Sequence, residues 1–231
     1  MELLEHTPES ALAIVAHPDD IEYGAAAAVA IWTAAGIDCR YLLASRGEAG
    51  IDGIDPSESG ALREAEQRAS AAVVGVDVVE FLSYPDGIIP NDLAIRRDFV
   101  EAIRKHKPET VLLFNHRETW VPGARNSADH RNVGAAALDA VADAGNRWVF
   151  PGTEPHKVKT VLVAGSPEST HLLEVSAGVE KAVESLSEHK AYLEGLGDHP
   201  MADPEYMRMF FAQAGEELGL AAALRVEVWN F

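Results

Sequence analysis

The chain has 231 residues, 47% of them hydrophobic, and its 37 acidic residues outnumber its 19 basic residues to give a formal net charge of −18. This length and apolar content predict a folded α/β domain and exclude a disordered chain. A surface so acidic argues against nucleic acid and anionic membranes as partners. The lone cysteine, Cys39, excludes an internal disulfide, and the N-terminus lacks the basic and apolar segments of a secretory signal, so we expect a soluble cytoplasmic protein.

Strands and helices are predicted to alternate from the N-terminus onward. Residues 10–16 are apolar throughout, which is typical of a strand buried on both faces of a parallel sheet. An alanine-rich helix over residues 21–35 follows and ends at Gly36; this longest apolar stretch is too short to span a bilayer. The next predicted strands are residues 37–44, 76–82 and 110–114, and the next predicted helices are residues 59–74, 92–106 and 129–144.

The C-terminal part continues the same pattern. It contains predicted strands over residues 158–164 and 171–175, predicted helices over residues 179–193 and 204–218, and an alternating segment over residues 224–229 that predicts an edge strand. No repeat, low-complexity tract or shift in composition marks a second domain. We therefore predict a single domain over residues 1–231, an α/β fold with a Rossmann-like, doubly wound, mostly parallel sheet and helices on both faces.

Four polar segments follow predicted strands. They are residues 16–22, 46–53, 84–87 and 115–130. Because crossovers between parallel strands are right-handed, the carboxyl ends of these strands should share one edge of the sheet, and we expect the four segments to converge there. Open α/β sheets bind their ligands at that edge, so the sequence predicts the functional site in the same place.

His17, Asp19 and Asp20 lie where the first strand gives way to a helix, an unfavourable place for ionisable groups unless a metal or a reaction holds them. An imidazole and a carboxylate three residues apart can take two positions of a divalent metal, and a third ligand leaves the fourth position for water, as in catalytic zinc sites. His130 is the best third ligand because it begins a helix directly after the 115–127 loop. Asp19, adjacent to a ligand, could then accept a proton from the water.

Two motifs resemble those of a known family. Residues 16–22, Ala-His-Pro-Asp-Asp-Ile-Glu, are similar to the first motif of the LmbE-like/PIG-L deacetylases, and residues 128–134, Ala-Asp-His-Arg-Asn-Val-Gly, resemble the second. Members of this family are zinc-dependent amide hydrolases that typically remove acetyl groups from N-acetylglucosamine conjugates. The resemblance therefore implies an N-deacetylase whose substrate is a small N-acetylated molecule, and because relatives often assemble it leaves a homo-oligomer open.

The resemblance also implies a role for individual residues. His17, Asp20 and His130 correspond to the family's zinc ligands, and Asp19 corresponds to its general base. Arg63, in the run Leu-Arg-Glu-Ala over residues 62–65, matches an arginine that holds hydroxyl groups of the substrate. An ion pair on a helix surface is the alternative role for this arginine.

The second motif departs from the family at one position. Many members read His-Pro-Asp-His there, and the first histidine stabilises the oxyanion or protonates the amine, whereas this chain has Ser127. A hydroxyl can donate a hydrogen bond to an oxyanion but is a poor acid near neutral pH. Either His116 takes over, or Asp19 passes on the proton that it collected from water. Asp129 is expected to orient a histidine or simply to occupy the first turn of its helix, next to His130.

Aromatic residues are candidates for substrate binding. Trp120 and Trp148 could each present a ring to the apolar face of a sugar, although core or surface packing explains a tryptophan equally well. Specificity should lie in the loops over residues 46–60 and 115–127 and in the region after Trp148. None of these segments carries a motif that names the leaving amine.

Two other functions stay open. The chain could be a metal-binding family member with little catalysis, in which case Ser127 marks the loss. It could also be a non-catalytic domain that binds a nucleotide or another small molecule, but no Gly-x-Gly-x-x-Gly follows the first strand, and two carboxylates there would repel a pyrophosphate. A serine hydrolase and a zincin protease are not supported, since neither Gly-x-Ser-x-Gly nor His-Glu-x-x-His occurs.

Overall fold

The computed structural model describes residues 1–203 and 205–231. The strands are β1 (Glu2–Leu3), β2 (Ser10–Val15), β3 (Asp38–Leu43), β4 (Val78–Phe81), β5 (Thr110–Phe114), β6 (Thr119–Val121), β7 (Ala124–Arg125), β8 (Thr160–Ala164), β9 (His171–Glu174) and β10 (Ala223–Asn230). The helices are α1 (Asp20–Gly24), α2 (Ala26–Ala34), α3 (Pro56–Val73), α4 (Leu93–His106), α5 (Ala128–Ala144), α6 (Val179–Leu186), α7 (Lys190–Leu196) and α8 (Glu205–Gly215), with short 3₁₀ helices η1 (Ser176–Gly178), η2 (Pro200–Ala202) and η3 (Glu216–Leu218). Pro204, where the last helix was predicted to begin, lies outside the described residues.

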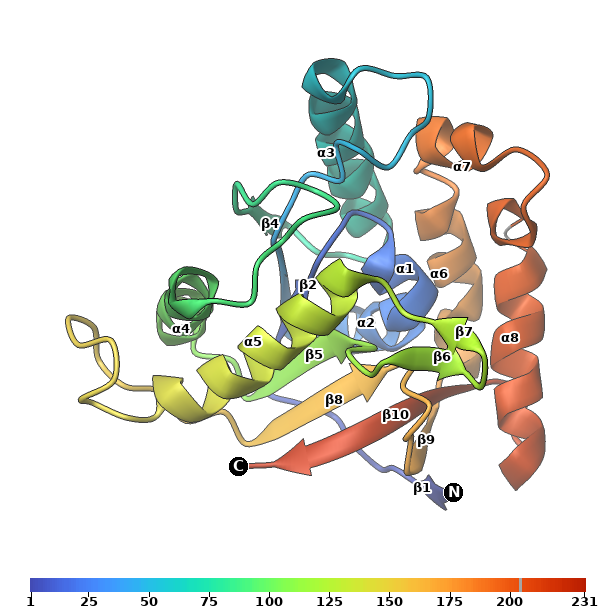
Figure 1. The fold of residues 1–231 in the computed structure, drawn as a ribbon. Coiled ribbons are helices and arrows are strands. Elements are labelled where there is room, and N and C mark those ends of the chain that lie inside the picture. Colours follow the sequence, from blue (N-terminus) through green and yellow to red (C-terminus); the bar gives the residue numbers. More distant parts are fainter. Residues whose placement is uncertain (204) are drawn as a thin grey trace.

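An eight-stranded sheet forms the centre of the described chain, in the order β1-β9-β10-β8-β5-β2-β3-β4 (Figure 1). From β8 to β4 each strand is parallel to its neighbour, and β10 runs antiparallel to both β8 and β9. The predicted α/β fold with a mostly parallel sheet is therefore confirmed. The carboxyl ends of β2, β3, β4 and β5 meet at one edge, and the four polar segments leave the sheet there.

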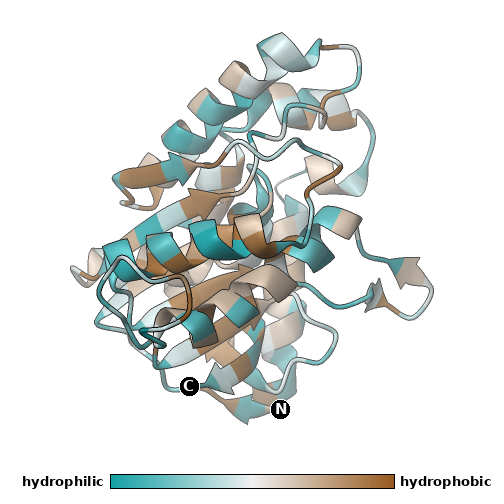
Figure 2. Ribbon diagram, turned by 60° about the vertical axis from the view of Figure 1, so that its left-hand side comes forward, coloured by the Kyte–Doolittle hydropathy of each residue, from teal (hydrophilic) through white to brown (hydrophobic). Residues whose placement is uncertain are grey.

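Alternate residues of β2 face two separate apolar cores. Ala13 and Val15 pack with residues of α1, α2, α3, α6 and α8, whereas Leu12 and Ile14 pack with residues of α4 and α5. Successive side chains of a strand point to opposite faces, so one apolar strand supplies both cores and helices cover both faces. Figure 2 shows the central strands largely apolar and the long helices mixed in hydropathy. No helix within residues 1–203 or 205–231 combines the length and apolar character needed to cross a membrane.

Two predicted helices are each divided in the structure. The helix predicted over residues 21–35 is α1 and α2, because Ala25 leaves helical geometry with φ −116° and ψ 2°. The preceding Gly24 packs so closely on β5 that a Cβ atom there would lie 3.1 Å from the Phe114 ring. The helix predicted over residues 179–193 is α6 and α7, and the buried His189 lies at the break between them.

The prediction of an edge strand over residues 224–229 is wrong. β10 lies inside the sheet, between β8 and β9. Its polar residue Glu227 is buried and accepts hydrogen bonds from Arg117 and Ser166, so a charged side chain is tolerated on an interior strand. The loop predicted over residues 115–127 also contains a small hairpin of β6 and β7, which projects beside the carboxyl edge (Figure 1).

Candidate metal centre and active site

Asp20 begins α1 and turns its carboxylate back over the β2–α1 turn. Its Oδ2 accepts the backbone N–H groups of Ala16, at 3.0 Å, and of His17, at 2.9 Å. Burial raises the pKa of a carboxyl group, but His130 and His17 outweigh that effect and hold the pKa of Asp20 far below its usual range. Asp20 is therefore a fixed, charged carboxylate at the carboxyl edge of the sheet.

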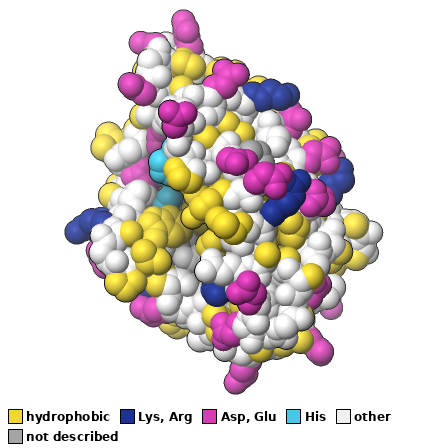
Figure 3. Space-filling model, turned by 90° about the vertical axis from the view of Figure 1, so that its right-hand side faces the viewer, with side chains coloured by type: hydrophobic (Ala, Val, Ile, Leu, Met, Phe, Trp, Pro, Cys, Tyr) yellow, Lys and Arg dark blue, Asp and Glu magenta, His cyan; other side chains and the backbone are white. Residues whose placement is uncertain are grey.

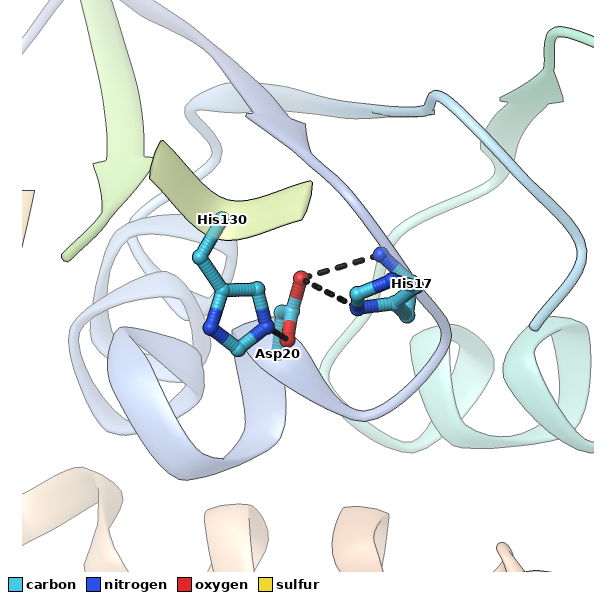
Figure 4. A group of neighbouring side chains, drawn as sticks. All are labelled: His17, Asp20 and His130. Atoms are coloured by element: carbon cyan, nitrogen blue, oxygen red, sulfur yellow. Dashed lines mark hydrogen bonds and ion pairs between the residues drawn. The ribbon is translucent and has the colours of Figure 1, made fainter. Parts of the chain in front are cut away.

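His17, Asp20 and His130 form a group that can bind a metal ion (Figure 4). One ligand atom from each lies within 4.8 Å of the others. Asp20 Oδ1 is 3.0 Å from His130 Nε2, and Asp20 Oδ2 is 3.7 Å from His17 Nδ1. The carboxylate thus lies between two imidazoles, one from the turn after β2 and one from the first turn of α5. Two imidazole nitrogens and one carboxylate oxygen fit the donor set of a catalytic divalent-metal site.

The outer nitrogen of His17 faces two carboxylates. Nε2 is 3.1 Å from Asp86 Oδ1 and 3.1 Å from Asp129 Oδ2. Because carboxylates only accept, Nε2 carries a proton, and Nδ1 is the nitrogen left to face Asp20. Burial lowers the pKa of His17, but Asp129, Asp20 and Asp86 outweigh burial and raise the pKa well above its usual value. A metal ligand whose second nitrogen donates to a carboxylate is the usual arrangement at metal sites in proteins.

His130 is oriented by an amide rather than by a carboxylate. Its Nδ1 lies 2.9 Å from Asn126 Oδ1. The Nδ2 group of Asn126 donates to the carbonyl oxygens of Asn115, at 2.7 Å, and Arg117, at 3.0 Å. These two bonds fix which end of the amide faces the histidine, so Nδ1 of His130 donates and Nε2 presents its lone pair toward Asp20.

Asp19 is buried beside this group. It has a left-handed backbone, with φ 91°, and its carboxylate forms an ion pair with Arg63 Nη2. Its backbone N–H donates to Gln67 Oε1 at 3.1 Å. Burial raises the pKa of Asp19 to about 6, with Arg63 opposing the rise and Asp20 adding to it. A carboxyl group with that pKa can both take up and release a proton near neutral pH.

Arg63 crosses from α3 to the site and is 2% exposed. Its Nη1 donates to Gly47 O at 2.9 Å, and its Nη2 donates to Pro18 O at 2.7 Å as well as to Asp19. Glycines make room for the guanidinium: a Cβ atom at Gly47, which has φ +64°, would lie 2.1 Å from Nη1, and one at Gly50 would lie 2.4 Å away. The structure therefore uses Arg63 to hold Asp19, and the predicted substrate contact stays a prediction.

Asp129 and Ser127 both lie at the start of α5. Asp129 accepts the N–H groups of Gly87, at 2.7 Å, and Ile89, at 3.0 Å, in addition to contacting His17. Ser127 is the N-cap residue of α5, and its Oγ accepts the N–H of His130 at 3.1 Å. Asp129 is thus placed to orient a histidine, as one of its two predicted roles requires. The proposed donation from Ser127 to an oxyanion is not tested by this contact.

Trp120 packs beside the candidate metal ligand His130, together with Phe114. Its ring centroid is 5.6 Å from that of His130 and 5.0 Å from that of Phe114. Phe114 in turn lies 5.3 Å from His130. The β6–β7 hairpin therefore places a half-buried indole next to the site, where it can contact a bound molecule.

His116 and Trp148 are the two remaining residues that were predicted to serve the site. His116 packs on Gly134 of α5, where a Cβ atom would lie 2.4 Å from the histidine Cβ. Its pKa is lowered, first by burial and then by Arg117, and its Nδ1 has no hydrogen-bond partner among the described residues. Trp148 follows the far end of α5, a helix about 25 Å long, and is 83% exposed. Trp148 therefore lies on the surface, which agrees with the alternative of surface packing.

Sequence reasoning missed three residues that orient the site, namely Asp86, Asn126 and Gln67. Asp86 lies in the 84–87 turn, which was expected at this edge without a role for the side chain. Asn126 precedes His130 by four residues, one helical turn, and Gln67 follows Arg63 by the same spacing. In α3 that spacing places Arg63 and Gln67 on one helix face and could have indicated Gln67. Asn126 precedes the N-cap Ser127 and lies outside α5, so helix periodicity gave no signal for it.

The fold and the site together define an α/β protein with a Rossmann-like sheet and a group of side chains that can bind a metal ion. The family described as PIG-L: GlcNAc-PI de-N-acetylase matches residues 12–141, more than half of the chain. The matched segment contains both motifs and every candidate ligand. The chain belongs to this family, and the resemblance found in the two motifs is confirmed.

Named relatives agree with this assignment. A diacetylchitobiose deacetylase of Thermococcus kodakarensis is 30% identical over 187 residues, which are 78% of this chain and 68% of that protein. A 1D-myo-inositol 2-acetamido-2-deoxy-alpha-D-glucopyranoside deacetylase of Kineococcus radiotolerans is 27% identical over 228 residues. That alignment covers 83% of this chain and 58% of that protein. The structure of N,N'-diacetylchitobiose deacetylase from Pyrococcus horikoshii, complexed with an inhibitor, has a TM-score of 0.86 over 96% of this chain and 84% of that chain at 21% identity, and shows the shared fold.

Proposed function

We propose that this protein is a zinc-dependent amide hydrolase that removes an acetyl group from an N-acetylated amino-sugar conjugate or a related small molecule. The observation that carries the proposal is the His17–Asp20–His130 group with the buried Asp19 directly beside it. Membership of the PIG-L family and the names of the two deacetylase relatives support the reaction.

Zinc is the metal that the donor set favours. Imidazole nitrogens suit zinc and related transition metals, whereas magnesium and calcium prefer oxygen ligands throughout. A divalent metal bound by His17, Asp20 and His130 supplies a Lewis acid for the amide carbonyl and lowers the pKa of a water molecule. The hydrogen bonds from His17 to Asp129 and from His130 to Asn126 keep the two imidazoles in the tautomers that metal binding needs.

Asp19 is the proposed proton acceptor and donor. Its carboxylate removes a proton from the attacking water, whose oxygen adds to the carbonyl carbon of the amide. Arg63 fixes the orientation of that carboxylate through the ion pair. When the C–N bond breaks, the same proton passes from Asp19 to the departing amine, and acetate is released. His116 is the alternative donor to the amine, and Ser127 is the proposed donor to the developing oxyanion.

Trp120 is proposed to contact the substrate. Its ring lies beside His130, and a sugar can stack its apolar face on an indole. On the face shown in Figure 3, exposed histidine side chains adjoin a group of hydrophobic side chains.

The test is acetate release from a panel that includes N-acetylglucosamine and diacetylchitobiose, with and without a chelator. We expect metal-dependent release by the wild type. Asp19→Asn should keep its metal, measured by elemental analysis, while kcat falls by about 10²–10⁴-fold, the usual contribution of a general base. Asp139→Asn makes the same change at a side chain that is 61% exposed and lies outside the predicted specificity loops, and it is the matched control.

The outcomes separate the proposed functions. Full activity in Asp19→Asn would remove Asp19 as the base. Metal binding without release from any panel member would favour a family member with little catalysis. No metal binding at all would contradict both zinc-based functions and return the chain to a non-catalytic small-molecule-binding domain.

A further inference from the structure

The buried face of α3 is polar, although a helix normally packs an apolar stripe against the core. The side chains buried on this face are Ser59, Arg63, Glu66, Gln67 and Ser70, each at most 8% exposed. Burying polar groups is costly unless they are paired, so this face is built for something other than packing. Its partners are α1, the turn that holds Asp19, α6 and the chain around α7.

Gln67 connects Asp19 to a second buried carboxylate. Its Oε1 accepts the backbone N–H of Asp19 at 3.1 Å, and its Nε2 donates to Glu22 Oε1 at 2.8 Å. Ser70 Oγ donates to the same Glu22 oxygen at 2.6 Å. Because a carboxylate can only accept, Glu22 fixes which end of the Gln67 amide faces Asp19.

The backbone of Asp19 needs such support. Its φ of 91° lies in the left-handed region, which side chains other than glycine rarely adopt. Arg63 and Gln67, one helical turn apart on α3, bind its two ends, with Arg63 on the carboxylate and Gln67 on the backbone N–H. One helix face therefore sets both the conformation and the side-chain direction of Asp19.

The C-terminal part of the chain closes over this face. His189 Nε2 lies 3.6 Å from Glu22 Oε2, and both side chains are fully buried. The N–H of Ala191 donates to Glu66 Oε1 at 2.6 Å, and the Tyr192 ring lies 4.4 Å from Arg63 Cζ. These contacts keep solvent away from the polar face and hold α3 in place.

We infer that Gln67 is a positioning residue for Asp19, and that Glu22 acts through it. The inference rests on the proposed function only for its effect on rate, because the contact with the Asp19 N–H is a property of the fold. Gln67→Leu removes both hydrogen bonds with little change in volume. Ser59→Ala is the matched control, since Ser59 lies on the same face, is fully buried and has an Oγ without a hydrogen-bond partner among the described residues.

The first measurement is independent of activity. In the metal-loaded chain, hydrogen exchange of the Asp19 amide, followed by NMR, should accelerate about tenfold or more in Gln67→Leu and stay unchanged in Ser59→Ala. Unchanged protection of Asp19 in Gln67→Leu would overturn the inference. If that variant fails to fold, Glu22→Gln serves instead, because an amide partner no longer fixes the orientation of Gln67, and faster exchange at Asp19 is again expected.

The second measurement uses kinetics. Gln67→Leu should lower kcat by about 10- to 100-fold through misplacement of the base, with KM and metal content within about twofold of the wild type. In the Asp19→Asn background the same change should cost almost nothing further, because its effect runs through Asp19. An equal loss in both backgrounds would contradict the inference. Absence of deacetylation in the wild type would count against the proposed function, and the exchange measurement would still decide the role of Gln67.

Discussion

Asp129 joins the candidate metal ligand His17 to the turn after β4. Its two carboxylate oxygens accept the N–H groups of Gly87 and Ile89, and Oδ2 also faces His17 Nε2. Backbone donors fix the carboxylate, and the carboxylate fixes the imidazole. The orientation of His17 therefore depends on a residue that need not touch the metal.

Asp129→Asn should weaken metal binding by about 10- to 100-fold, the range seen when such outer partners are changed. The amide lacks the charge that stabilises a donating imidazole, and one of its two ends can no longer accept a backbone N–H. Competition with a chromophoric chelator measures the affinity. Asp139→Asn, on the same helix and with a side chain 61% exposed, makes the same change in net charge and should leave the affinity unaltered. Equal affinities in the two variants would show that Asp129 does not support the site.

At the scale of the elements, β10 and the loop that leads into the β6–β7 hairpin are joined by an ion pair between the buried Glu227 and the half-buried Arg117. Glu227 on β10 binds Arg117 through both carboxylate oxygens, and it also accepts from Ser166 Oγ at 2.7 Å. Burial raises the pKa of Glu227, but Arg117 and Ser166 outweigh burial and lower the pKa below its ordinary value. Glu227 therefore has a lower pKa in the folded protein than in the unfolded chain. The ion pair stabilises the fold at pH values above the pKa of the unfolded chain, and this stabilisation is lost as pH falls through the pKa of the folded protein.

Glu227→Gln should destabilise the protein by about 1–3 kcal/mol at pH 7, since it leaves Arg117 without its buried partner. The difference in stability between variant and wild type should shrink as pH falls from about 5 to 3, where the wild-type carboxylate takes up its proton. Urea denaturation at a series of pH values measures this. Glu168→Gln is the control, because Glu168 also contacts Arg117, at 2.9 Å, but its side chain is 59% exposed and its pair is screened by water. A pH-independent difference for Glu227→Gln would contradict the assignment.

The same strand shows where sequence reasoning fails on the fold. Leu224, Val226 and Val228 alternate with polar residues, and that pattern predicts one dry face and one wet face. In the structure Glu227 on the polar face is also buried, and its charge is compensated by Arg117, which is 110 residues away in sequence. Local periodicity carries no information about such a distant partner. The alanine-rich run over residues 21–35 fails for a different reason, because it has no periodicity that could mark its break at Ala25.

Part of the candidate site could be predicted because the topology of a parallel sheet fixes where its loops meet. Once the strands are parallel, their carboxyl ends must share an edge, and His17, Asp20 and His130 follow from that rule. The buried polar face of α3 could not be predicted from the sequence. Charged residues are frequent around Arg63, and such a run is typical of a helix exposed to solvent. Only the packing of α1, α6 and α7 against α3 reveals that this face is buried.

At the scale of the whole molecule, the net charge of −18 bears on the choice of substrate. The face in Figure 3 carries more acidic than basic side chains. The basic Arg63 close to the site is buried and paired with Asp19. With a net charge of −18 the potential around the molecule is negative, and it should favour neutral or cationic molecules over anionic ones.

We expect a phosphorylated form of any sugar that this enzyme deacetylates to have a kcat/KM at least about tenfold lower than the neutral sugar at low ionic strength. Salt screens charges over a Debye length of about 10 Å at 0.1 M and about 3 Å at 1 M, so the gap should narrow when salt is raised through that range. Rates for the neutral sugar over the same range control for direct effects of salt on the enzyme. A gap that does not change with salt would mean that shape, rather than charge, excludes the phosphate. A phosphorylated sugar that reacts faster than the neutral one would show that the site contains an anion-binding group, contrary to the electrostatics of this surface.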